Sequence, residues 1–312
     1  DKIMYHGQTL FAVVADTRAQ ARDAAEKVQA EITPLSPILS IDAAVEQDSF
    51  LEKPMSLSSG EAENAYATAP CQLSGELYAG GQEHFYLEGQ AAIAQADENG
   101  GIQLFVSTQH PSEIQHKVAG MLGLTYGDVQ VDVRRMGGGF GGKESQSNLT
   151  ACIAALAAHK TKRPARLIYD RDDDMRVTGK RHDMKLVYKV GFDTDGRMTA
   201  LIIDQYLRCG MSYDLSKAIA IRAMTHAENA YAIPNTRITA HLCRTHTPSN
   251  TAFRGFGGPQ GMIGIEQIID KIAAHLNIDP INVRQLNYYP DYEAGTLCCT
   301  PYGQIVKDGL LG

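Results

Sequence analysis

A run of glycines constrains this chain more than any other feature. Five glycines stand in the six positions from Gly137 to Gly142, and only Phe140 interrupts them. Glycine costs roughly 0.5–1 kcal/mol relative to alanine inside regular structure, so the run indicates backbone that takes positive φ or approaches a ligand. Apolar residues precede it at 129–133, and an alanine-rich stretch follows at 143–159. The pattern predicts a strand, a glycine loop and a helix whose N-terminus suits a phosphate or oxyanion.

Helical and strand periodicities alternate irregularly along the rest of the chain. Residues 185–192 and 198–207 are two runs joined by Asp193-Thr194-Asp195-Gly196, which predicts an antiparallel hairpin with glycine where positive φ is needed. Further strands are expected at 10–15, 104–106, 165–169 and 237–243, and further helices after Thr17 and at 112–122 and 261–276. Helices combined with partly antiparallel strands predict the α+β class.

The length of the chain suggests two domains. Its 312 residues exceed the roughly 100–200 residues of a typical single domain. The apolar run at 10–15, expected as a buried strand, and the helix after Thr17 predict a small α/β unit. Residues 34–70 show no sustained periodicity and are rich in Ser, Pro, Glu and Ala, so we expect a connection there. We place the domain boundary between residues 65 and 66.

Charge and composition limit the kinds of partner. The chain has 36 acidic and 29 basic residues, a net charge of −7, and no long run of like charges. Nucleic acids and anionic membranes require clustered lysine and arginine, so neither is an expected partner. No apolar stretch approaches the roughly 18 residues that span a bilayer, and the first residues lack the pattern of a signal peptide. We therefore expect a cytoplasmic protein whose partner is a small molecule or another protein.

The six cysteines form no pattern typical of a metal site or a disulfide framework. Only Cys298 and Cys299 are adjacent, and the others are widely scattered. His241, Cys243 and His246 lie close in sequence, but the first two alternate on an expected strand and lack a second ligand pair. We expect reduced thiols and a structural role for Cys298 and Cys299.

Two nucleotide-binding patterns overlap the glycine run. The pattern G-x-G-x-x-G begins at Gly137 and ends at Gly142, and Asp170 follows the next expected strand, where a ribose-binding carboxylate could lie. This alternative predicts an NAD-binding dehydrogenase. A phosphate-loop pattern ending at Lys143 also fits, but Glu144 follows where Ser or Thr should bind magnesium. A carboxylate there would repel phosphate, so only the dinucleotide interpretation stays open.

A second glycine-rich stretch suggests that both loops serve one ligand. Phe253-Arg254-Gly255-Phe256-Gly257-Gly258 sets an arginine and two phenylalanines among glycines before another expected helix. Two backbone loops that end at helix N-termini suit a large cofactor with phosphate and oxo groups. Exposed phenylalanine rings offer stacking faces to a planar substrate. The plainer interpretation is that both loops are tight packing turns.

Taken together, four segments resemble the molybdenum-binding subunit of xanthine dehydrogenases, in the xanthine oxidase family of molybdenum hydroxylases. They are GGQEHFYLE at 80–88, STQ at 107–109, GGGFGGKE at 137–144 and AFRGFGGPQ at 252–260. The resemblance implies that residues 1–65 are the C-terminal part of an α/β hammerhead-like domain with its linker. It implies that residues 66–312 are the first molybdenum-cofactor-binding domain, incomplete relative to the family.

The resemblance implies a molybdenum–molybdopterin cofactor. Gln109 would hydrogen-bond an oxo ligand of the molybdenum, and the backbone at Phe140 and Arg254 would line the metal's oxygen ligands. An amide and backbone N–H groups suit this role, because they donate to an oxo group without competing as metal ligands. In the family a dithiolene of the pterin holds the metal, so no Cys/His ligand set is expected. The remaining cofactor-binding residues would be Gly139, Ala252 and Phe253.

The same resemblance implies a purine substrate. Glu144 and Arg222 are similar to the two charged residues that orient the purine in the family, and Phe256 to one of the rings that sandwich it. Negative charge builds on a xanthine-like carbonyl oxygen during attack at carbon, and a guanidinium there stabilises the transition state selectively. Related aldehyde oxidases typically lack this charged pair. The pair therefore favours oxidation of xanthine or hypoxanthine to urate, with water as the oxygen source.

Other parts of such an enzyme are expected outside this chain. The family's general base is a glutamate of a later domain, so we expect no catalytic residue within residues 1–312 and no activity of this segment alone. The 2Fe–2S clusters and FAD that pass electrons to NAD are expected on partner modules, in an oligomeric assembly. Besides the NAD-binding dehydrogenase, a non-catalytic accessory subunit stays open as an alternative.

Overall fold

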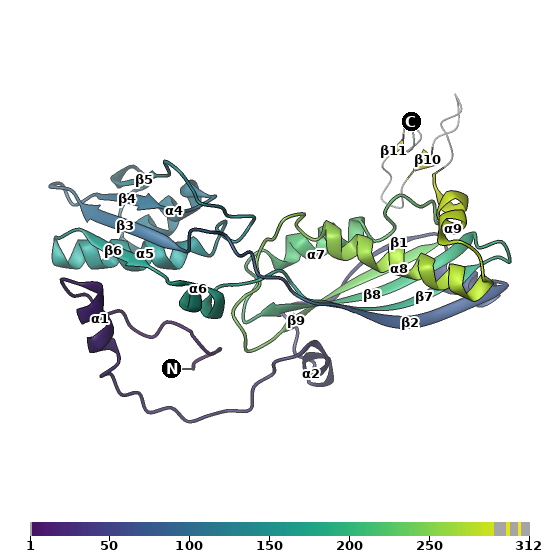
Figure 1. Cartoon of the computed structure of the whole chain (residues 1–312), viewed down its shortest axis with the longest axis horizontal. Coiled ribbons are helices and arrows are strands. Elements are labelled where there is room, and N and C mark those ends of the chain that lie inside the picture. Colours follow the sequence, from purple (N-terminus) through teal and green to yellow (C-terminus); the bar gives the residue numbers. More distant parts are fainter. Residues whose placement is uncertain (1, 290–297, 300–304, 307–312) are drawn as a thin grey trace. The chain divides into compact units, whose positions relative to one another are not determined.

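The computed structural model describes residues 2–289, 298–299 and 305–306 (Figure 1). The chain forms two compact units, each built from separate stretches of sequence. The first unit comprises residues 1–39, 82–181 and 246–254, and the second comprises residues 40–81, 182–245 and 255–312. Each unit combines helices with a sheet of parallel and antiparallel strand pairs. This arrangement confirms the expected α+β class.

The first unit is a four-stranded sheet with the order β5-β4-β3-β6. Strands β4 and β5 pair in parallel, and the other neighbours pair antiparallel. Helices α4 and α5 pack against one face of this sheet (Figure 1). The elements of this unit are α1 (Arg18–Ala25), β3 (Ala91–Ala96), β4 (Ile102–Val106), α4 (Pro111–Leu122), a 3-10 turn (Tyr126–Asp128), β5 (Val129–Asp132), α5 (Ser147–Thr161), β6 (Ala165–Ile168) and α6 (Arg171–Val177).

The core of the first unit is built largely from small side chains. In β3, Ala92 and Ala94 are buried, whereas Ile93 between them is 41% exposed on the opposite face. Ala151 and Ala155 of α5 belong to the same buried cluster as the two strand alanines. Small residues on both partners let the helix and the sheet approach closely. Among the described residues, the buried cluster of this unit thus lies on the face of the sheet that carries Ala92 and Ala94.

The second unit is a five-stranded sheet with the order β1-β9-β8-β7-β2. Helices α7 and α8 supply apolar side chains to the core that covers one face of this sheet. Strands β8 and β9 pair in parallel. The elements of this unit are α2 (Ile41–Glu46), β1 (Met55–Ser59), α3 (Ala62–Thr68), β2 (Cys71–Ala79), β7 (Met184–Phe192), β8 (Met198–Gly210), α7 (Ser216–Thr225), β9 (Thr236–Arg244), α8 (Gly258–Leu276), α9 (Pro280–Asn287), β10 (Cys298–Cys299) and β11 (Ile305–Val306). The side chains of Cys298 and Cys299, expected to be structural, lie outside the described residues.

The predicted hairpin is confirmed as β7 and β8. These strands pair antiparallel, and Asp193 closes the turn because its Oδ1 accepts hydrogen bonds from the N–H groups of Asp195 and Arg197 at 3.0 and 2.9 Å. Gly196 has φ of +99°, a conformation that side chains with a Cβ rarely adopt. The residue types in this turn are therefore sufficient to predict the hairpin.

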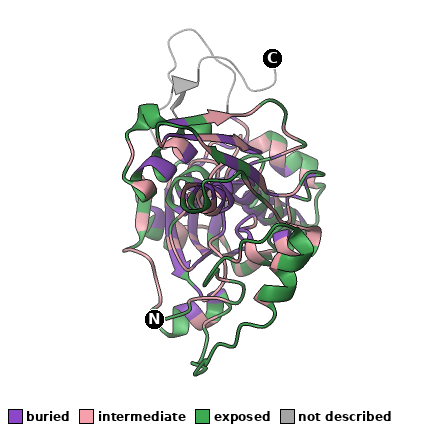
Figure 2. Ribbon diagram, turned by 90° about the vertical axis from the view of Figure 1, so that its left-hand side faces the viewer, coloured by how far each residue is buried: buried purple, intermediate pink, exposed green. Residues whose placement is uncertain are grey.

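The buried strand predicted at residues 10–15 is wrong. Leu10, Phe11 and Val14 are 53%, 47% and 54% exposed, and this N-terminal stretch is largely green in Figure 2. It pairs with no strand among the described residues. An apolar run is buried as a strand only where another strand and a covering layer meet it, and no local pattern reports that. The helix after Thr17 does form, with a capping box between Thr17 and Gln20.

Asp170 connects α1 with α6. Its carboxylate caps α6 by accepting a hydrogen bond from the Asp173 N–H at 3.0 Å, and it pairs with Arg22 of α1. These contacts, first the Asp173 amide and then the Arg22 guanidinium, lower the pKa of Asp170 to about 2. The carboxylate is therefore stabilised as the anion in the folded protein.

Asp170→Ala is expected to destabilise α6 by about 1 kcal/mol, because it removes the helix cap. Asp170→Asn keeps a capping oxygen and loses only the charge, so its cost should be smaller. Because the folded pKa lies below the unfolded value, the contribution of the charge is complete above about pH 5 and is lost as the pH falls towards about 2. Urea unfolding of the three proteins at several pH values measures this. A wild-type advantage over Asp170→Asn that persists at the acidic end would contradict the assignment.

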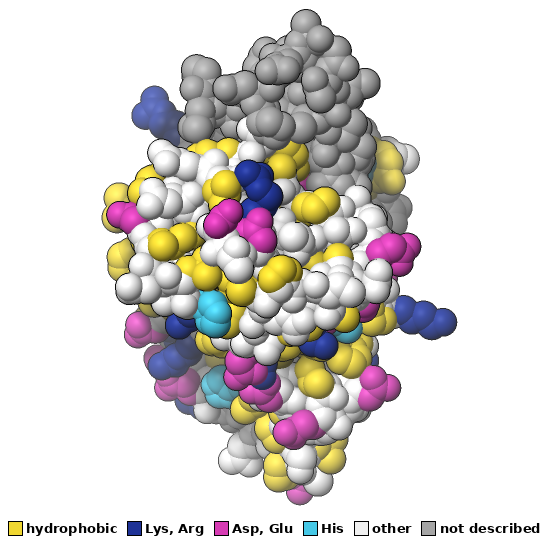
Figure 3. Space-filling model, turned by 90° about the vertical axis from the view of Figure 1, so that its right-hand side faces the viewer, with side chains coloured by type: hydrophobic (Ala, Val, Ile, Leu, Met, Phe, Trp, Pro, Cys, Tyr) yellow, Lys and Arg dark blue, Asp and Glu magenta, His cyan; other side chains and the backbone are white. Residues whose placement is uncertain are grey.

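No helix in the described part of the chain is both long and apolar enough to cross a membrane. Acidic and basic side chains are interspersed over the face seen in Figure 3.

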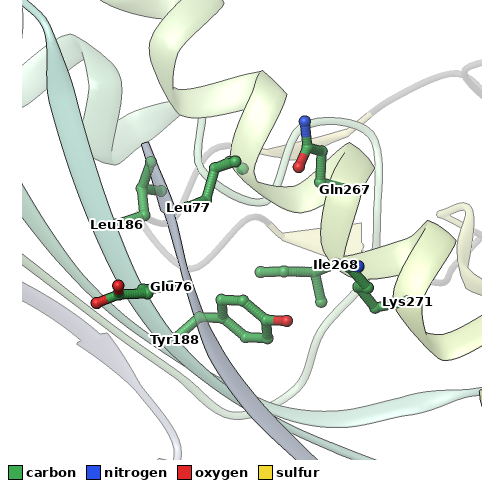
Figure 4. A pocket seen from close by; sticks show the side chains of 8 residues that line it. Glu76, Leu77, Leu186, Tyr188, Gln267, Ile268 and Lys271 are labelled. Carbon is green, nitrogen blue, oxygen red and sulfur yellow. The ribbon is translucent and has the colours of Figure 1, made fainter. Parts of the chain in front are cut away.

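A crevice of about 20 Å³ lies where Leu77 and Leu186 approach Ile268 of α8 (Figure 4). It has room for about one water molecule, so it offers no ligand site.

Candidate cofactor site

The glycine loop lies in the first unit, between β5 and α5. Gly138 and Gly141 both have φ of +97°, and Phe140 between them has φ of +52°. Helix α5 begins at Ser147, not at Lys143 as the sequence predicted. The difference has a physical cause, because side chains and backbone at the end of β4 hold both the amide and the carbonyl of Lys143. The loop is therefore longer than expected.

Gln109 follows β4 and is the residue that holds the glycine loop. Its Oε1 accepts hydrogen bonds from the N–H of Gly141 at 2.8 Å and of Lys143 at 3.3 Å. The two N–H donors identify the oxygen side of the amide, so Nε2 is the other end and makes no hydrogen bond to a described residue. Gln109 is exposed. It therefore offers a free N–H donor beside the loop. A Cβ added to Gly139 would lie 2.5 Å from Oε1, so a side chain there would displace the Gln109 amide.

Lys143 is completely buried behind the loop. Its Nζ donates to the carbonyl oxygen of Glu88 at 2.6 Å and to the hydroxyl of Ser107 at 2.7 Å, and it lies 4.6 Å from the centre of the Tyr86 ring. Burial lowers the pKa of Lys143, and the nearby Glu88 carboxylate partly opposes this. A lysine engaged in this way has no role in phosphate binding, which removes the phosphate-loop interpretation.

Glu88 fastens the start of the loop. Its Oε2 accepts hydrogen bonds from the Gly137 N–H at 2.8 Å and from the Ser107 hydroxyl at 2.7 Å. Burial alone would raise the pKa of Glu88, but these hydrogen bonds and the charge of Lys143 together lower it. Sequence reasoning missed this role of Glu88 and Ser107. The available signal was that both lie inside the short segments that resemble the family.

The second loop meets the first one within the same unit. The Arg254 N–H donates to the Phe140 carbonyl at 2.9 Å. A Cβ on Gly141 would lie 2.7 Å from the carbonyl carbon and oxygen of Ala252. Ala252 is buried, and its carbonyl lies 2.6 Å from His84 Nε2, which fits an N–H donor there. Within the first unit, residues 252–254 of the second loop therefore contact the first loop directly.

Phe253 is fixed between two partners. The His84 ring lies 4.7 Å from its centre, and the Arg181 guanidinium lies 4.0 Å from it. Arg181 also donates to the Arg254 carbonyl at 2.9 Å. Burial lowers the pKa of His84, so this ring stays neutral at neutral pH. The Phe253 ring is therefore not a free stacking surface, whereas the Phe140 side chain is 51% exposed.

Residues 45–288, which include both glycine-rich loops, match the family of molybdopterin cofactor-binding domains. This chain belongs to that family. Xanthine dehydrogenase/oxidase of Felis catus is 45% identical over 292 residues, which are 93% of this chain and 22% of that protein. Xanthine dehydrogenase of Drosophila pseudoobscura pseudoobscura is 46% identical over 286 residues, 91% of this chain and 21% of that protein. The chain thus spans about a fifth of the length of these relatives, and the resemblance found in the sequence is confirmed.

A solved structure shows the same fold. The aldehyde oxidoreductase of Desulfovibrio gigas superposes with a TM-score of 0.84 at 28% identity, over 93% of this chain and 32% of that one. This chain therefore shares its fold with a part of that oxidoreductase. The likeness also means that homologues of this chain are oxidoreductases built from more than this segment.

The first unit suits a molybdopterin cofactor in the chemistry of its donors. Among the described residues no group of three or more His, Cys, Asp or Glu could hold a metal ion directly. The Nε2 group of the Gln109 side chain and the backbone N–H of Phe140 make no hydrogen bond to a described residue, so both are available to oxygen ligands. The Arg254 N–H is already used by Phe140, which makes the Phe140 amide the stronger of the two backbone candidates.

The three substrate candidates lie on different elements. Glu144 is half-buried in the turn before α5 and forms no ion pair with a described residue. Arg222 is exposed in the last turn of α7, and its guanidinium also pairs with no described carboxylate. Phe256 has φ of +49° and packs partly against the core of the second unit. Glu144 belongs to the first unit and the other two belong to the second.

The dinucleotide interpretation finds no support at its carboxylate. Asp170 is occupied as the cap of α6 and as the partner of Arg22 and Arg18. The N–H groups of Gly141 and Lys143 are taken by Gln109, so they cannot bind a pyrophosphate.

Proposed function

We propose that this chain is a segment of a molybdenum-dependent purine hydroxylase of the xanthine dehydrogenase type. The observation that carries the proposal is the fixed amide of Gln109, with Oε1 bound to the glycine loop and Nε2 left free. Such a donor suits an oxo ligand, and the 45% identity to a xanthine dehydrogenase/oxidase supports the same reaction class.

The cofactor would be bound by the two loops of the first unit. Gln109 and the Phe140 N–H would donate to oxygen ligands, and Gly139 and Gly141 would let the backbone come close. When bound, the molybdenum–molybdopterin group supplies the two-electron redox centre and the oxygen that is transferred. The residues of this chain would hold that group and orient its oxygen ligands. Ala252, Phe253 and Arg254 complete the proposed binding set.

We propose that Glu144, Arg222 and Phe256 bind the substrate. Each role rests separately on the chemistry of the residue and on the resemblance to the family. The Arg222 guanidinium would bind the purine carbonyl oxygen on which negative charge develops. Glu144 would hydrogen-bond the N–H edge of the ring, and Phe256 would stack on its face. The charged groups of Glu144 and Arg222 are available to a substrate, because neither forms an ion pair with a described residue.

The proposal includes parts outside these residues. The general base would be a glutamate of a later domain, and electrons would leave through 2Fe–2S clusters and FAD towards NAD on partner modules, in an oligomeric enzyme of the cytoplasm. The assignment of residues 1–65 to a hammerhead-like domain and of 66–312 to the first cofactor domain belongs to the same proposal. The segment alone would then have no activity.

The test is made on the full-length natural protein that contains these residues, purified from its own host. Elemental analysis measures molybdenum, and urate formation from xanthine measures turnover. We expect stoichiometric molybdenum and urate. Molybdenum without purine turnover would overturn the substrate while keeping the cofactor, and absence of molybdenum with working maturation machinery would overturn both.

Gln109→Glu separates the two ends of the amide. The glutamate keeps an oxygen for the Gly141 and Lys143 N–H groups but replaces the Nε2 donor with a second acceptor. We expect the molybdenum content to be retained and kcat on xanthine to fall by roughly 100-fold, the usual effect of removing one donor to a reacting centre. Steady-state kinetics normalised to molybdenum measures this. A kcat within twofold of the wild type would contradict the donor role.

A further inference from the structure

The face of the first unit's sheet that turns away from α4 and α5 carries an ordered row of side chains. Residues directly opposite one another across the strands are Arg166 and Ile93, Ile93 and Phe105, and Phe105 and Asp132. Their inward-pointing neighbours Ala92 and Leu104 are buried in the core. The row therefore lies on the side without a covering layer among the described residues.

This row forms the floor of an open groove of about 310 Å³. Ile93 is 41% exposed, and Phe105 is half-buried. Arg134, Arg135 and Arg166 line its sides. The Arg134 guanidinium lies 5.4 Å from the centre of the Phe105 ring, so it lies over the apolar floor. The groove thus combines an apolar strip with guanidinium groups.

The charge of the groove is positive although the chain is acidic overall. Arg134, Arg135 and Arg166 are exposed, and none forms an ion pair with a described residue. Asp132 is one opposing charge. The other carboxylate, Glu88, is already bound to Lys143, Ser107 and the loop backbone. The groove therefore has three solvent-exposed guanidinium groups, and Asp132 is its one carboxylate that is not bound to another described group.

We propose that this groove, formed by Ile93, Phe105, Arg134, Arg135 and Arg166, binds an acidic polypeptide segment of the full-length protein that lies outside residues 1–312. An apolar side chain of that segment would cover Ile93 and Phe105, and its carboxylates would pair with the arginines. Guanidinium groups suit carboxylates because they donate two parallel hydrogen bonds. The relatives are four to five times longer than this chain, so ample polypeptide exists to supply the segment. The proposal is independent of the reaction proposed above.

Cross-linking in the purified full-length protein identifies the occupant. Ile93 is replaced by the photoreactive amino acid p-benzoylphenylalanine, and the cross-linked peptides are sequenced by mass spectrometry. Leu149, 41% exposed on α5, serves as the control position. We expect Ile93 to capture one segment of the same polypeptide that contains aspartate or glutamate, and Leu149 not to capture it. Capture of a segment without acidic residues, of a second copy, or of nothing would overturn the proposal.

Charge reversal tests the guanidinium contacts. In Arg134→Glu/Arg166→Glu, the captured segment should exchange its amide hydrogens at least tenfold faster than in the wild type, while α5 is unchanged. Arg163→Glu is the control, because this arginine is 74% exposed and pairs with Asp16 away from the groove. Replacing the segment's acidic residues with lysine should restore protection in the double variant. Unchanged exchange in the double variant, or failure of the lysine exchange to restore protection, would overturn the pairing.

Discussion

Arg222→Met is expected to lower kcat on xanthine by roughly 100- to 1,000-fold in the full-length enzyme, while molybdenum content is spared. The effect should be specific to catalysis and should not arise from a loss of stability. Arg222 is exposed at the end of α7 and pairs with no described carboxylate, so its removal leaves no buried partner unsatisfied. The loss should therefore appear in the transition state, where charge develops on the substrate oxygen. Steady-state kinetics with elemental analysis of the same samples measures both quantities.

Lys217→Met is the matched control for that variant. Lys217 lies on the same helix, is 54% exposed, and pairs with Glu52 at the surface. Removing such a pair usually changes stability by less than about 1 kcal/mol. We expect kcat to stay within twofold of the wild type. If Arg222→Met and Lys217→Met gave the same kcat, the substrate role of Arg222 would be refuted.

Gly141→Ala is expected to reduce both molybdenum content and activity, by roughly 100-fold for activity. Gly141 has φ of +97°, which costs an alanine about 1–2 kcal/mol. Its new Cβ would also lie 2.7 Å from the Ala252 carbonyl, which would push the two loops apart and break the hydrogen bond from Gly141 to Gln109. Elemental analysis and xanthine turnover measure the effect.

Gly120→Ala provides the comparison. Gly120 lies in α4, and an added Cβ there would meet nothing within 4 Å. Alanine in an exposed helix position stabilises by about 0.5–1 kcal/mol relative to glycine, so this variant should keep its molybdenum and activity. The pair of variants separates the loop contact from the general effect of losing a glycine. Full molybdenum in Gly141→Ala would contradict the cofactor role of the loop.

Much of the fold was predictable from local chemistry. The hairpin turn at Asp193 to Gly196 and the capping box at Thr17 are both determined by residues within four positions of each other. The glycine loop was predictable for the same reason, because only a loop tolerates five glycines in six positions. Elements of this kind need no information from distant residues.

The errors concern residues whose partners are distant in sequence. Residues 10–15 have the composition of a strand, but no strand among the described residues pairs with them. Lys143 has a good position for a first helical turn, yet Gln109, 34 residues earlier, binds its amide. The burial of the Lys143 side chain against Glu88, 55 residues earlier, could not be predicted from the local sequence either. Candidate site residues could be named from motifs, whereas the contacts that hold them could not.

The division of the chain into six alternating stretches has a consequence for synthesis. The polypeptide passes between the two units five times, and the first unit is complete only with residues 246–254. Those residues contribute the Arg254 amide to the Phe140 carbonyl and the Ala252 backbone against Gly141. During translation the glycine loop therefore lacks its second wall until residue 254 has left the ribosome, long after its own residues have emerged. On the function proposed above, a cofactor supplied before that moment would meet only one of its two binding loops, so its insertion would follow the synthesis of residue 254.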